Sequence, residues 1–256
     1  MRISFSTAAL YPRLSLEALK LLNDVGFKEA ELMPQCYHET TPEFAKEVKK
    51  LEIRVSSIHF PLSYFSVLYN PYGGMVKEAK NLMDDLLLAG EIMGTDVIVI
   101  HALPYMEELK KEIFYNVVTE NIKYLASKGK EKNVKIALEN NPNTLGRTPE
   151  GLLDEVRRID HDNVQPMVDT TESWEADIEP EIFISKTRPI HLHLSDYKGD
   201  VKHLPLGEGK GNWEMIFNTI KSIDYSGIYV IEPAYKFYID DVVNKVRNAK
   251  NFIENI

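Results

Sequence analysis

The sequence predicts an α/β fold: a (β/α)8 TIM barrel formed by a single domain over residues 1–256. Short apolar or β-branched runs alternate with amphipathic helical stretches along the chain, which is typical of βα units around a parallel sheet. We count eight such units. A length of 256 residues fits one barrel, and no Gly/Ser/Pro-rich linker divides the sequence.

Each predicted unit begins with a strand and continues into a helix. Ser15, and the two threonines that precede proline, Thr41 and Thr148, are predicted helix starts, because a hydroxyl caps free amides and proline suits the first turn. Glycines are predicted to end three helices, at Gly26, Gly94 and Gly129. The strands are expected near residues 2–6, 28–33, 53–59, 96–101, 134–139, 164–169, 189–194 and 228–232.

Composition narrows the classes of partner and compartment. The net charge of −9 would repel a phosphate backbone, so nucleic acid is not the expected partner. The single cysteine, Cys36, cannot form an intramolecular disulfide, and the first ten residues lack the apolar core of a secretory signal. Fully apolar runs are far shorter than the roughly 20 residues that cross a bilayer. We therefore expect a cytoplasmic protein that does not bind membranes.

Residues of metal-ligand type stand at or just after the ends of the predicted strands. In a parallel barrel these ends meet at one mouth, so residues far apart in sequence should share a pocket. Carboxylates gathered there would repel one another unless a cation or protons neutralised them. One alternative is that acidic residues stand at strand ends only because these ends are exposed to water. The residues of metal-ligand type at or just after the strand ends are His59, His101, Glu139, Asp169, His193, His203 and Glu232.

Four of them, from four consecutive strands, form the main predicted metal site. Glu139, Asp169, His193 and Glu232 combine carboxylates with an imidazole, a set that suits Mn²⁺, Mg²⁺, Co²⁺ or Zn²⁺. His191 shares its strand face with His193, since alternate residues point the same way. It is expected one layer deeper, as a hydrogen-bonded core histidine.

The other histidines have two open interpretations. His59 and His101 could hold a second metal together with Glu139, or could hydrogen-bond a substrate hydroxyl. His203 lies in a polar loop and could simply be a surface residue. The same loop leads through Gly207 to Asn212, a predicted helix cap whose amides could receive an anion, although an ordinary βα turn is the favoured interpretation.

The motifs IHFP, VIVIHA, ALEN, MVDT, HLHLSD, PLGEG and VIEP, in this order, resemble the xylose isomerase-like barrel superfamily over nearly the whole chain. That superfamily includes sugar-phosphate isomerases and epimerases, and also endonuclease IV. The resemblance implies that the four-residue set holds a divalent metal. It also implies that His59, His101 and Glu139 match a further zinc site of the nuclease branch.

Departures from the family patterns separate its branches. Nuclease-like members carry a histidine three residues after the strand-six aspartate and an Asp-x-His pair before LGEG, whereas this chain has Glu172, Val201 and His203. The third metal site is therefore incomplete, although Glu172 or Asp200 could still donate oxygen. Ketose 3-epimerases usually keep that histidine and a second glutamate where this chain has Leu145. The substrate is therefore open.

The predicted activity is metal-dependent isomerisation or epimerisation of a sugar or sugar phosphate by proton transfer beside a carbonyl. Glu139 and Glu232 are the expected acid/base residues. The expected walls of the pocket are Trp174, Tyr64 and Phe65, with the alternative that these aromatic residues only anchor their loops. Two alternatives are an endonuclease IV-like phosphodiesterase acting on abasic DNA and a metal-stabilised binding barrel without catalysis. The sequence does not specify the metal or the oligomeric state.

Overall fold

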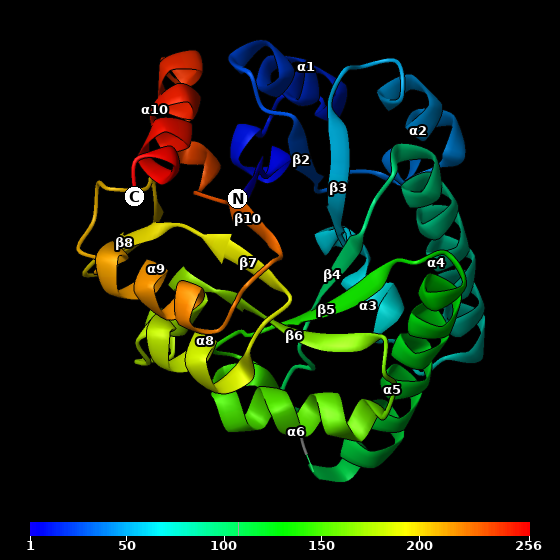
Figure 1. Ribbon diagram of the computed structural model, residues 1–256. Helices are drawn as coiled ribbons and strands as arrows, with labels where there is room; N and C mark the ends of the chain where they lie inside the picture. Colours follow the sequence, from blue (N-terminus) through cyan, green and yellow to red (C-terminus); the bar gives the residue numbers. More distant parts are fainter. Residues whose placement is uncertain (107) are drawn as a thin grey trace.

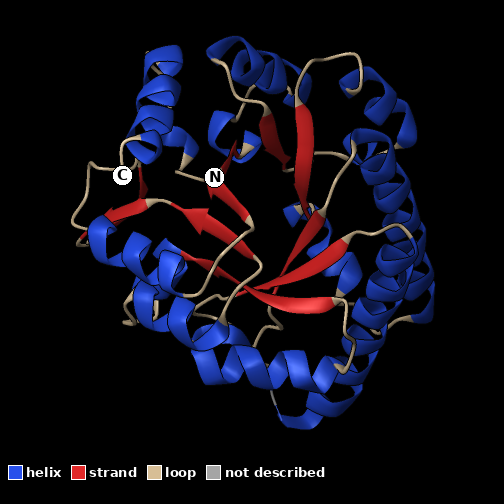
Figure 2. Cartoon of the chain, in the orientation of Figure 1, coloured by secondary structure: helices blue, strands red, loops and turns tan. Residues whose placement is uncertain are grey.

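The computed structural model describes residues 1–106 and 108–256 and forms an eight-stranded parallel barrel surrounded by helices (Figures 1 and 2). The strands are hydrogen-bonded in the order β1-β10-β7-β6-β5-β4-β3-β2. Between β1 and β2, the parallel bridge from Ser6 to Glu31 closes the ring. The barrel strands are β1 (Arg2–Phe5), β2 (Glu29–Leu32), β3 (Arg54–His59), β4 (Val97–His101), β5 (Lys135–Glu139), β6 (Val164–Asp169), β7 (His191–Leu194) and β10 (Ile228–Ile231).

The helices alternate with these strands and cover the outside of the barrel (Figure 2). A short antiparallel hairpin, β8 (Asp196–Lys198) and β9 (Val201–Leu204), follows β7. The helices are α1 (Ser15–Val25), α2 (Pro42–Val48), α3 (Phe65–Leu68), α4 (Gly73–Met93), α5 (Glu108–Glu131), α6 (Pro149–Ile159), α7 (Thr170–Glu175), α8 (Pro180–Thr187), α9 (Trp213–Ser222) and α10 (Val242–Glu254). The predicted (β/α)8 barrel is confirmed, and each observed strand lies within two residues of its predicted bounds.

The helix caps confirm some predicted boundaries and correct others. Thr41 and Thr148 each accept an amide N–H of the first turn, and Gly26 ends α1 in the left-handed conformation. Ser15 does not cap α1, because its hydroxyl donates to Glu39 at 2.8 Å. The helix end predicted at Gly129 is wrong by two residues, since α5 continues to Glu131.

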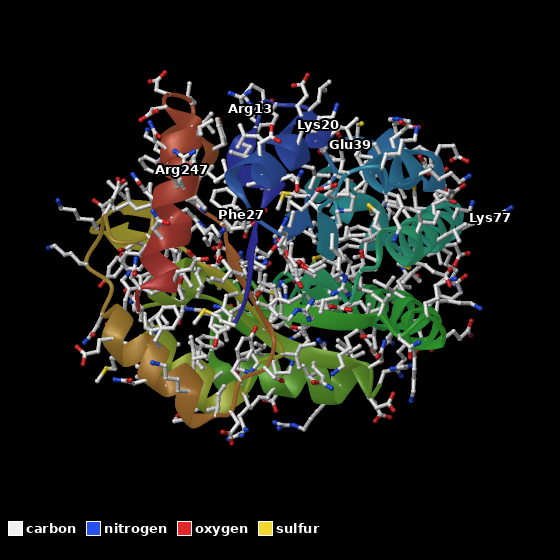
Figure 3. The ribbon with its side chains drawn as sticks, turned by 45° about the horizontal axis from the view of Figure 1, so that its top comes forward. Arg13, Lys20, Phe27, Glu39, Lys77 and Arg247 are labelled. Carbon is white, nitrogen blue, oxygen red and sulfur yellow. The ribbon has the colours of Figure 1, made fainter. Side chains whose placement is uncertain are left out.

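The apolar residues form two cores, one on each side of the barrel wall. The larger lies between the strands and the helix ring, and the smaller lies inside the barrel around Val97, Val99, Ala137 and Met167. Charged side chains such as Lys77 project outward from the ring (Figure 3). Among the described residues, no helix combines the length and apolar character needed to cross a bilayer. The inner core fills only part of the barrel, and polar side chains occupy its carboxyl end.

Candidate metal centre at the carboxyl end of the barrel

Strand periodicity carries chemical groups into the barrel at its carboxyl end. Val97, Val99 and His101 share one face of β4, because alternate side chains of a strand point the same way. His101 is in register with Glu139 on β5, and Asp169 on β6 is in register with His193 on β7. Apolar residues therefore fill the middle of the barrel, and ligand-type residues follow one layer above.

Four of these residues form the central cluster. Glu139, Asp169, His193 and Glu232 each offer one ligand atom, and these atoms all lie within 4.8 Å of one another. Nδ1 of His193 lies 2.6 Å from Oε2 of Glu232, 3.1 Å from Oε1 of Glu139 and 3.9 Å from Oδ2 of Asp169. His193, Asp169 and Glu139 are buried, whereas the side chain of Glu232 is 13% exposed. Solvent therefore reaches the cluster on the side of Glu232.

Two atoms of this cluster, Nδ1 of His193 and Oδ2 of Asp169, form no hydrogen bond of acceptable geometry within the described chain, although Nδ1 lies close to the oxygens of Glu232 and Glu139. The other carboxylate oxygen of Asp169 is used, since it accepts the amide N–H of Glu172 at the start of α7. Buried polar atoms without partners are costly, and both of these face the centre of the cluster. One imidazole nitrogen and three carboxylates fit a divalent cation.

The carboxylates of the central cluster form their described ion pairs with histidines. In the described part of the chain, neither Glu139, Asp169 nor Glu232 forms an ion pair with lysine or arginine. Burial raises the pKa of Asp169 to about 7, with a further contribution from Glu139. Burial lowers the pKa of His193, but Glu232, Glu31 and Glu139 raise it well above its ordinary value. Burial raises the pKa of Glu139, but His193 and His59 bring it well below its usual range.

A second group, His59, His101 and Glu139, adjoins the first. Nε2 of each histidine lies 3.3 Å from Oε2 of Glu139. Nδ1 of His59 lies 2.8 Å from the carbonyl oxygen of Phe60 and so donates to it. A neutral His59 would then turn a bare Nε2 toward a carboxylate oxygen, which requires a proton or a cation between them. Phe65 stacks on His101 with ring centroids 4.6 Å apart.

The two histidines of this group differ electrostatically. Burial lowers the pKa of His101 to about 4, so this ring is neutral near pH 7. Burial also lowers the pKa of His59, but its contact with Glu139 raises the pKa above the ordinary value. The neutral ring, 29% exposed, is the one available to a ligand from the mouth.

Glu172 and His203 form a pair beside the central cluster. Nε2 of His203 lies 3.6 Å from Oε1 of Glu172, and its Nδ1 lies 3.2 Å from the hydroxyl of Ser195. Burial lowers the pKa of His203, but Glu172 and Asp169 raise it to about 9. Asp200 is exposed in the turn of the β8–β9 hairpin and Val201 is exposed at the start of β9, so Asp200 does not take the place of the missing ligand.

The expected pocket walls differ in position. Phe65 contacts His59 and His101 edge-on and by stacking, respectively. Tyr64 is partly buried against the hydrophobic core. Trp174 stacks on Tyr197 at 4.2 Å, and its indole N–H donates to Glu179. Of the three, Phe65 is the one with a described contact to the histidines.

The glycine loop before α9 is an ordinary βα connection. Its amides point to the buried carboxylate of Asp196, which accepts the N–H groups of Gly207, Gly209 and Gly211. Asn212 caps α9 by accepting the N–H of Met215, as predicted. A carboxylate of the chain itself therefore occupies the place where an anion was considered.

The sequence reasoning missed Glu31. This residue on β2 is fully buried, and its carboxylate contacts Nε2 of both His191 and His193 at 3.0–3.2 Å. His191 is the deeper, hydrogen-bonded histidine that was expected. The signal for Glu31 was present, because the segment EAEL places an acid among apolar residues near a strand end.

The chain resembles several known proteins. The uncharacterized protein MJ1311 of Methanocaldococcus jannaschii is 26% identical over 273 residues, which covers 99% of this chain and 90% of that protein. L-ribulose-5-phosphate 3-epimerase UlaE of Escherichia coli is 28% identical over 90 residues, only 35% of this chain and 31% of that protein. The crystal structure of a D-tagatose 3-epimerase-like protein superposes with a TM-score of 0.80 at 24% identity, covering 100% of this chain and 98% of that one.

These likenesses agree with the motifs at the strand ends. The family described as xylose isomerase-like TIM barrel matches residues 19–255, which include every residue of the central cluster. The architecture, the order of the motifs and this match lead to one assignment. The chain belongs to the xylose isomerase-like TIM barrel family.

Proposed function

We propose that this protein is a divalent-metal-dependent sugar isomerase or epimerase that moves a proton at the carbon beside a carbonyl group. The observation that carries the proposal is the central cluster, in which Glu139, Asp169, His193 and Glu232 bring their ligand atoms within 4.8 Å of one another. UlaE and the D-tagatose 3-epimerase-like protein, whose names denote sugar epimerases, add support.

The central cluster would hold the cation through one imidazole nitrogen and three carboxylates. A bound divalent cation supplies Lewis-acid stabilisation of negative charge on the substrate oxygens. The suitable ions are Mn²⁺, Mg²⁺, Co²⁺ and Zn²⁺, because the ligands combine oxygen with imidazole nitrogen. Asp169 is held for this role from both sides, since its amide donates to Asn140 and its Oδ1 accepts from Glu172.

Glu139 and Glu232 are the proposed acid/base pair. They come from β5 and from the residue after β10, which are not neighbours in the sheet. One carboxylate accepts the proton as the C–H bond breaks, and the other delivers a proton to the opposite face of that carbon or to the next carbon. Ser6 donates to Oε1 of Glu232 at 3.0 Å and so fixes the orientation of this carboxylate.

His101, His59 and Phe65 are proposed to orient the substrate. His101 is partly exposed, and its pKa of about 4 leaves it neutral, so it can donate or accept a hydrogen bond with a sugar hydroxyl. Phe65, stacked against His101, offers an apolar face beside it. A second cation between these histidines and Glu139 is the alternative role for this group.

The decisive assay follows product and deuterium together. Metal-loaded protein is incubated in heavy water with a panel of ketoses, aldoses and their phosphates, and the sugars are analysed by NMR. The expected result is a new isomer or epimer with deuterium at the carbon beside the carbonyl. EDTA should abolish the reaction, and Mn²⁺, Co²⁺ or Mg²⁺ should restore it.

Three results would contradict the proposal. No product from any sugar of the panel would reject the isomerase assignment. Product without deuterium would reject proton exchange and favour a hydride shift. Nicking of an abasic duplex by the Zn²⁺-loaded protein, lost in Glu139→Gln, would replace the proposal with the nuclease alternative.

A further inference from the structure

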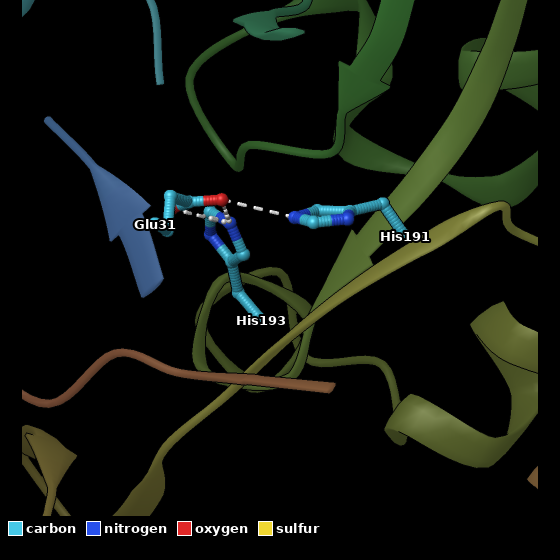
Figure 4. A group of neighbouring side chains, drawn as sticks. All are labelled: Glu31, His191 and His193. Atoms are coloured by element: carbon cyan, nitrogen blue, oxygen red, sulfur yellow. Dashed lines mark hydrogen bonds and ion pairs between the residues drawn. The ribbon is translucent and has the colours of Figure 1, made fainter. Parts of the chain in front are cut away.

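A third cluster lies one layer below the central cluster, and it consists of Glu31, His191 and His193 (Figure 4). All three side chains have 0% exposure. Glu31 comes from β2 and the histidines from β7, which lies three strands away from β2 around the closed barrel. We call this group the inner cluster. It shares His193 with the central cluster, so the two are linked through one imidazole ring.

The two nitrogens of His193 face different carboxylates. Nε2 lies 3.1 Å from Oε1 and 3.2 Å from Oε2 of Glu31, while Nδ1 lies 2.6 Å from Oε2 of Glu232. Metal binding requires a neutral imidazole, which carries one N–H, so in the metal-bound state only one of these sides can receive a hydrogen bond. The side without the proton presents a lone pair.

Glu31 is held in place for the role of acceptor. The hydroxyl of Ser57 donates to its Oε2 at 2.8 Å, and Nε2 of His191 lies 3.0 Å from the same oxygen. With the carboxylate fixed and no solvent access, a His193 tautomer with bare Nε2 would set two acceptors against each other. The tautomer with Nε2–H avoids this cost.

We propose that Glu31 is a positioning residue that accepts the Nε2–H of His193 and thereby keeps the Nδ1 lone pair directed at Glu139, Asp169 and Glu232. The inference rests on the proposed function, in which the central cluster holds a divalent cation. A carboxylate behind a metal-binding histidine fixes the ring and increases its basicity. Ser57 and His191 support Glu31 in turn. The inner cluster is thus a support for the metal site and not a site itself.

The test measures metal binding and the tautomer directly. Kd for Mn²⁺ or Zn²⁺ is measured by calorimetry on the wild type and on Glu31→Ala and Glu31→Gln, with folding checked by circular dichroism. The expected Glu31→Ala value is weaker by about 10–100-fold. Glu31→Gln should lie between, because its amide oxygen can still accept the N–H but carries no charge.

Glu39→Gln is the matched control. Glu39 is also a buried glutamate, 6% exposed, that accepts from a serine hydroxyl, but its described hydrogen bonds are to Ser15 and the amide of Gln35. The Glu39→Gln variant should keep its metal affinity within about twofold of the wild type, because Glu39 has no described hydrogen bond to the metal site. It therefore measures only the general destabilisation caused by the loss of a buried carboxylate.

Nitrogen NMR of histidine-labelled, Zn²⁺-loaded protein gives the second readout. The expected spectrum shows a metal-bound Nδ1 and a protonated Nε2 for His193. Unchanged metal affinity in Glu31→Ala, or zinc on Nε2 of His193, would overturn the inference. A second equivalent of metal that is lost in His191→Ala would also overturn it, by making the inner cluster a site of its own.

The two proposals can fail separately. A protein that binds Zn²⁺ through Nδ1 of His193, depends on Glu31 and converts no sugar contradicts the proposed function alone. If the protein converts a sugar but its metal Kd is the same in the wild type and in Glu31→Ala, this inference alone is contradicted.

Discussion

The two ends of the barrel treat charge in opposite ways. At the amino end, Arg2 pairs with Glu29 at 2.9 Å and with Asp96 at 2.7 Å, and Arg54 pairs with the same two acids. At the carboxyl end, the acids of the central cluster face histidines, and Nδ1 of His193 and Oδ2 of Asp169 have no hydrogen bond among the described residues.

The contrast separates charges that are paired within the fold from charges that we propose bind a cation. Guanidinium groups are permanently charged and satisfy several acceptors, so the amino end is complete without a ligand. A histidine can give up its proton and bind a metal instead, so under our proposal the carboxyl end exchanges a proton for a cation. A cavity of about 450 Å³ opens at the amino end beside Arg2. The arginines that line it have partners within the protein, since Arg2 pairs with acidic side chains and Arg188 donates to the carbonyl oxygen of Ile223.

The largest effect is expected on turnover, and only substitutions at the carboxyl end of the barrel should cause it. Glu139→Gln or Glu232→Gln should lower turnover by about 10²–10⁴, as expected for a lost general acid or base. The measurement is the initial rate on the active sugar, with Glu214→Gln on the exposed side of α9 as control. Activity within tenfold of the wild type in both variants would remove these glutamates from the acid/base role.

A buried carboxylate outside the candidate site, that of Glu155, shows the effect of burial alone. Glu155 of α6 accepts the N–H of Leu103 at 2.7 Å, and burial raises its pKa from the ordinary 4.5 to about 7. The folded state therefore holds this proton more tightly than the unfolded state. Its stabilising contribution is present below pH 4.5 and is lost as the pH rises to about 7.

Urea unfolding at several pH values tests this sign. Relative to Glu155→Gln, the wild type should lose about 3 kcal/mol of unfolding free energy between pH 4.5 and 7.5, at 1.36 kcal/mol per pKa unit. Subtracting the variant removes the contributions of other titrating groups. A difference between the two proteins that is flat over this range would contradict the raised pKa.

Metal binding should stabilise the folded protein through the carboxyl end. At a free metal concentration of 100 times Kd, the gain is about 2.7 kcal/mol, which raises the melting temperature by about 5–10 °C. His193→Ala should abolish the increase, whereas Arg54→Met at the amino end should retain it. An equal increase in His193→Ala would place the bound metal elsewhere.

The smallest effect is expected at the amino end. Asp96→Asn should reduce the unfolding free energy by about 0–1 kcal/mol, because its ion pairs are 37–40% exposed and screened by water. Metal affinity should not change. A weakened metal Kd in this variant would show that the two ends are coupled and would break the comparison.

Local patterns in the sequence predicted most of the fold. Thr41 and Thr148 cap helices as expected, because capping depends on neighbours three residues away. Alternation along β4 and β5 likewise placed His101 beside Glu139. Ser15 failed as a cap because Glu39, distant in sequence, takes its hydroxyl.

The candidate site was predicted less completely because parts of it depend on distant pairings. Glu31 meets His193 across 162 positions of sequence, at a place created by closure of the barrel. Trp174 stacks on Tyr197 because the β8–β9 hairpin lies beside α7, which no local pattern indicated. The residues at strand ends were visible in the sequence, whereas their supports were visible only in the fold.

The most direct test of the metal centre is anomalous diffraction from crystals soaked in Mn²⁺. The account predicts a peak at the carboxyl end, within about 2.0–2.4 Å of Nδ1 of His193 and of oxygens from Glu139, Asp169 and Glu232. A peak bound only by Glu31, His191 and Nε2 of His193, or no peak in the barrel at full soaking concentration, would contradict it.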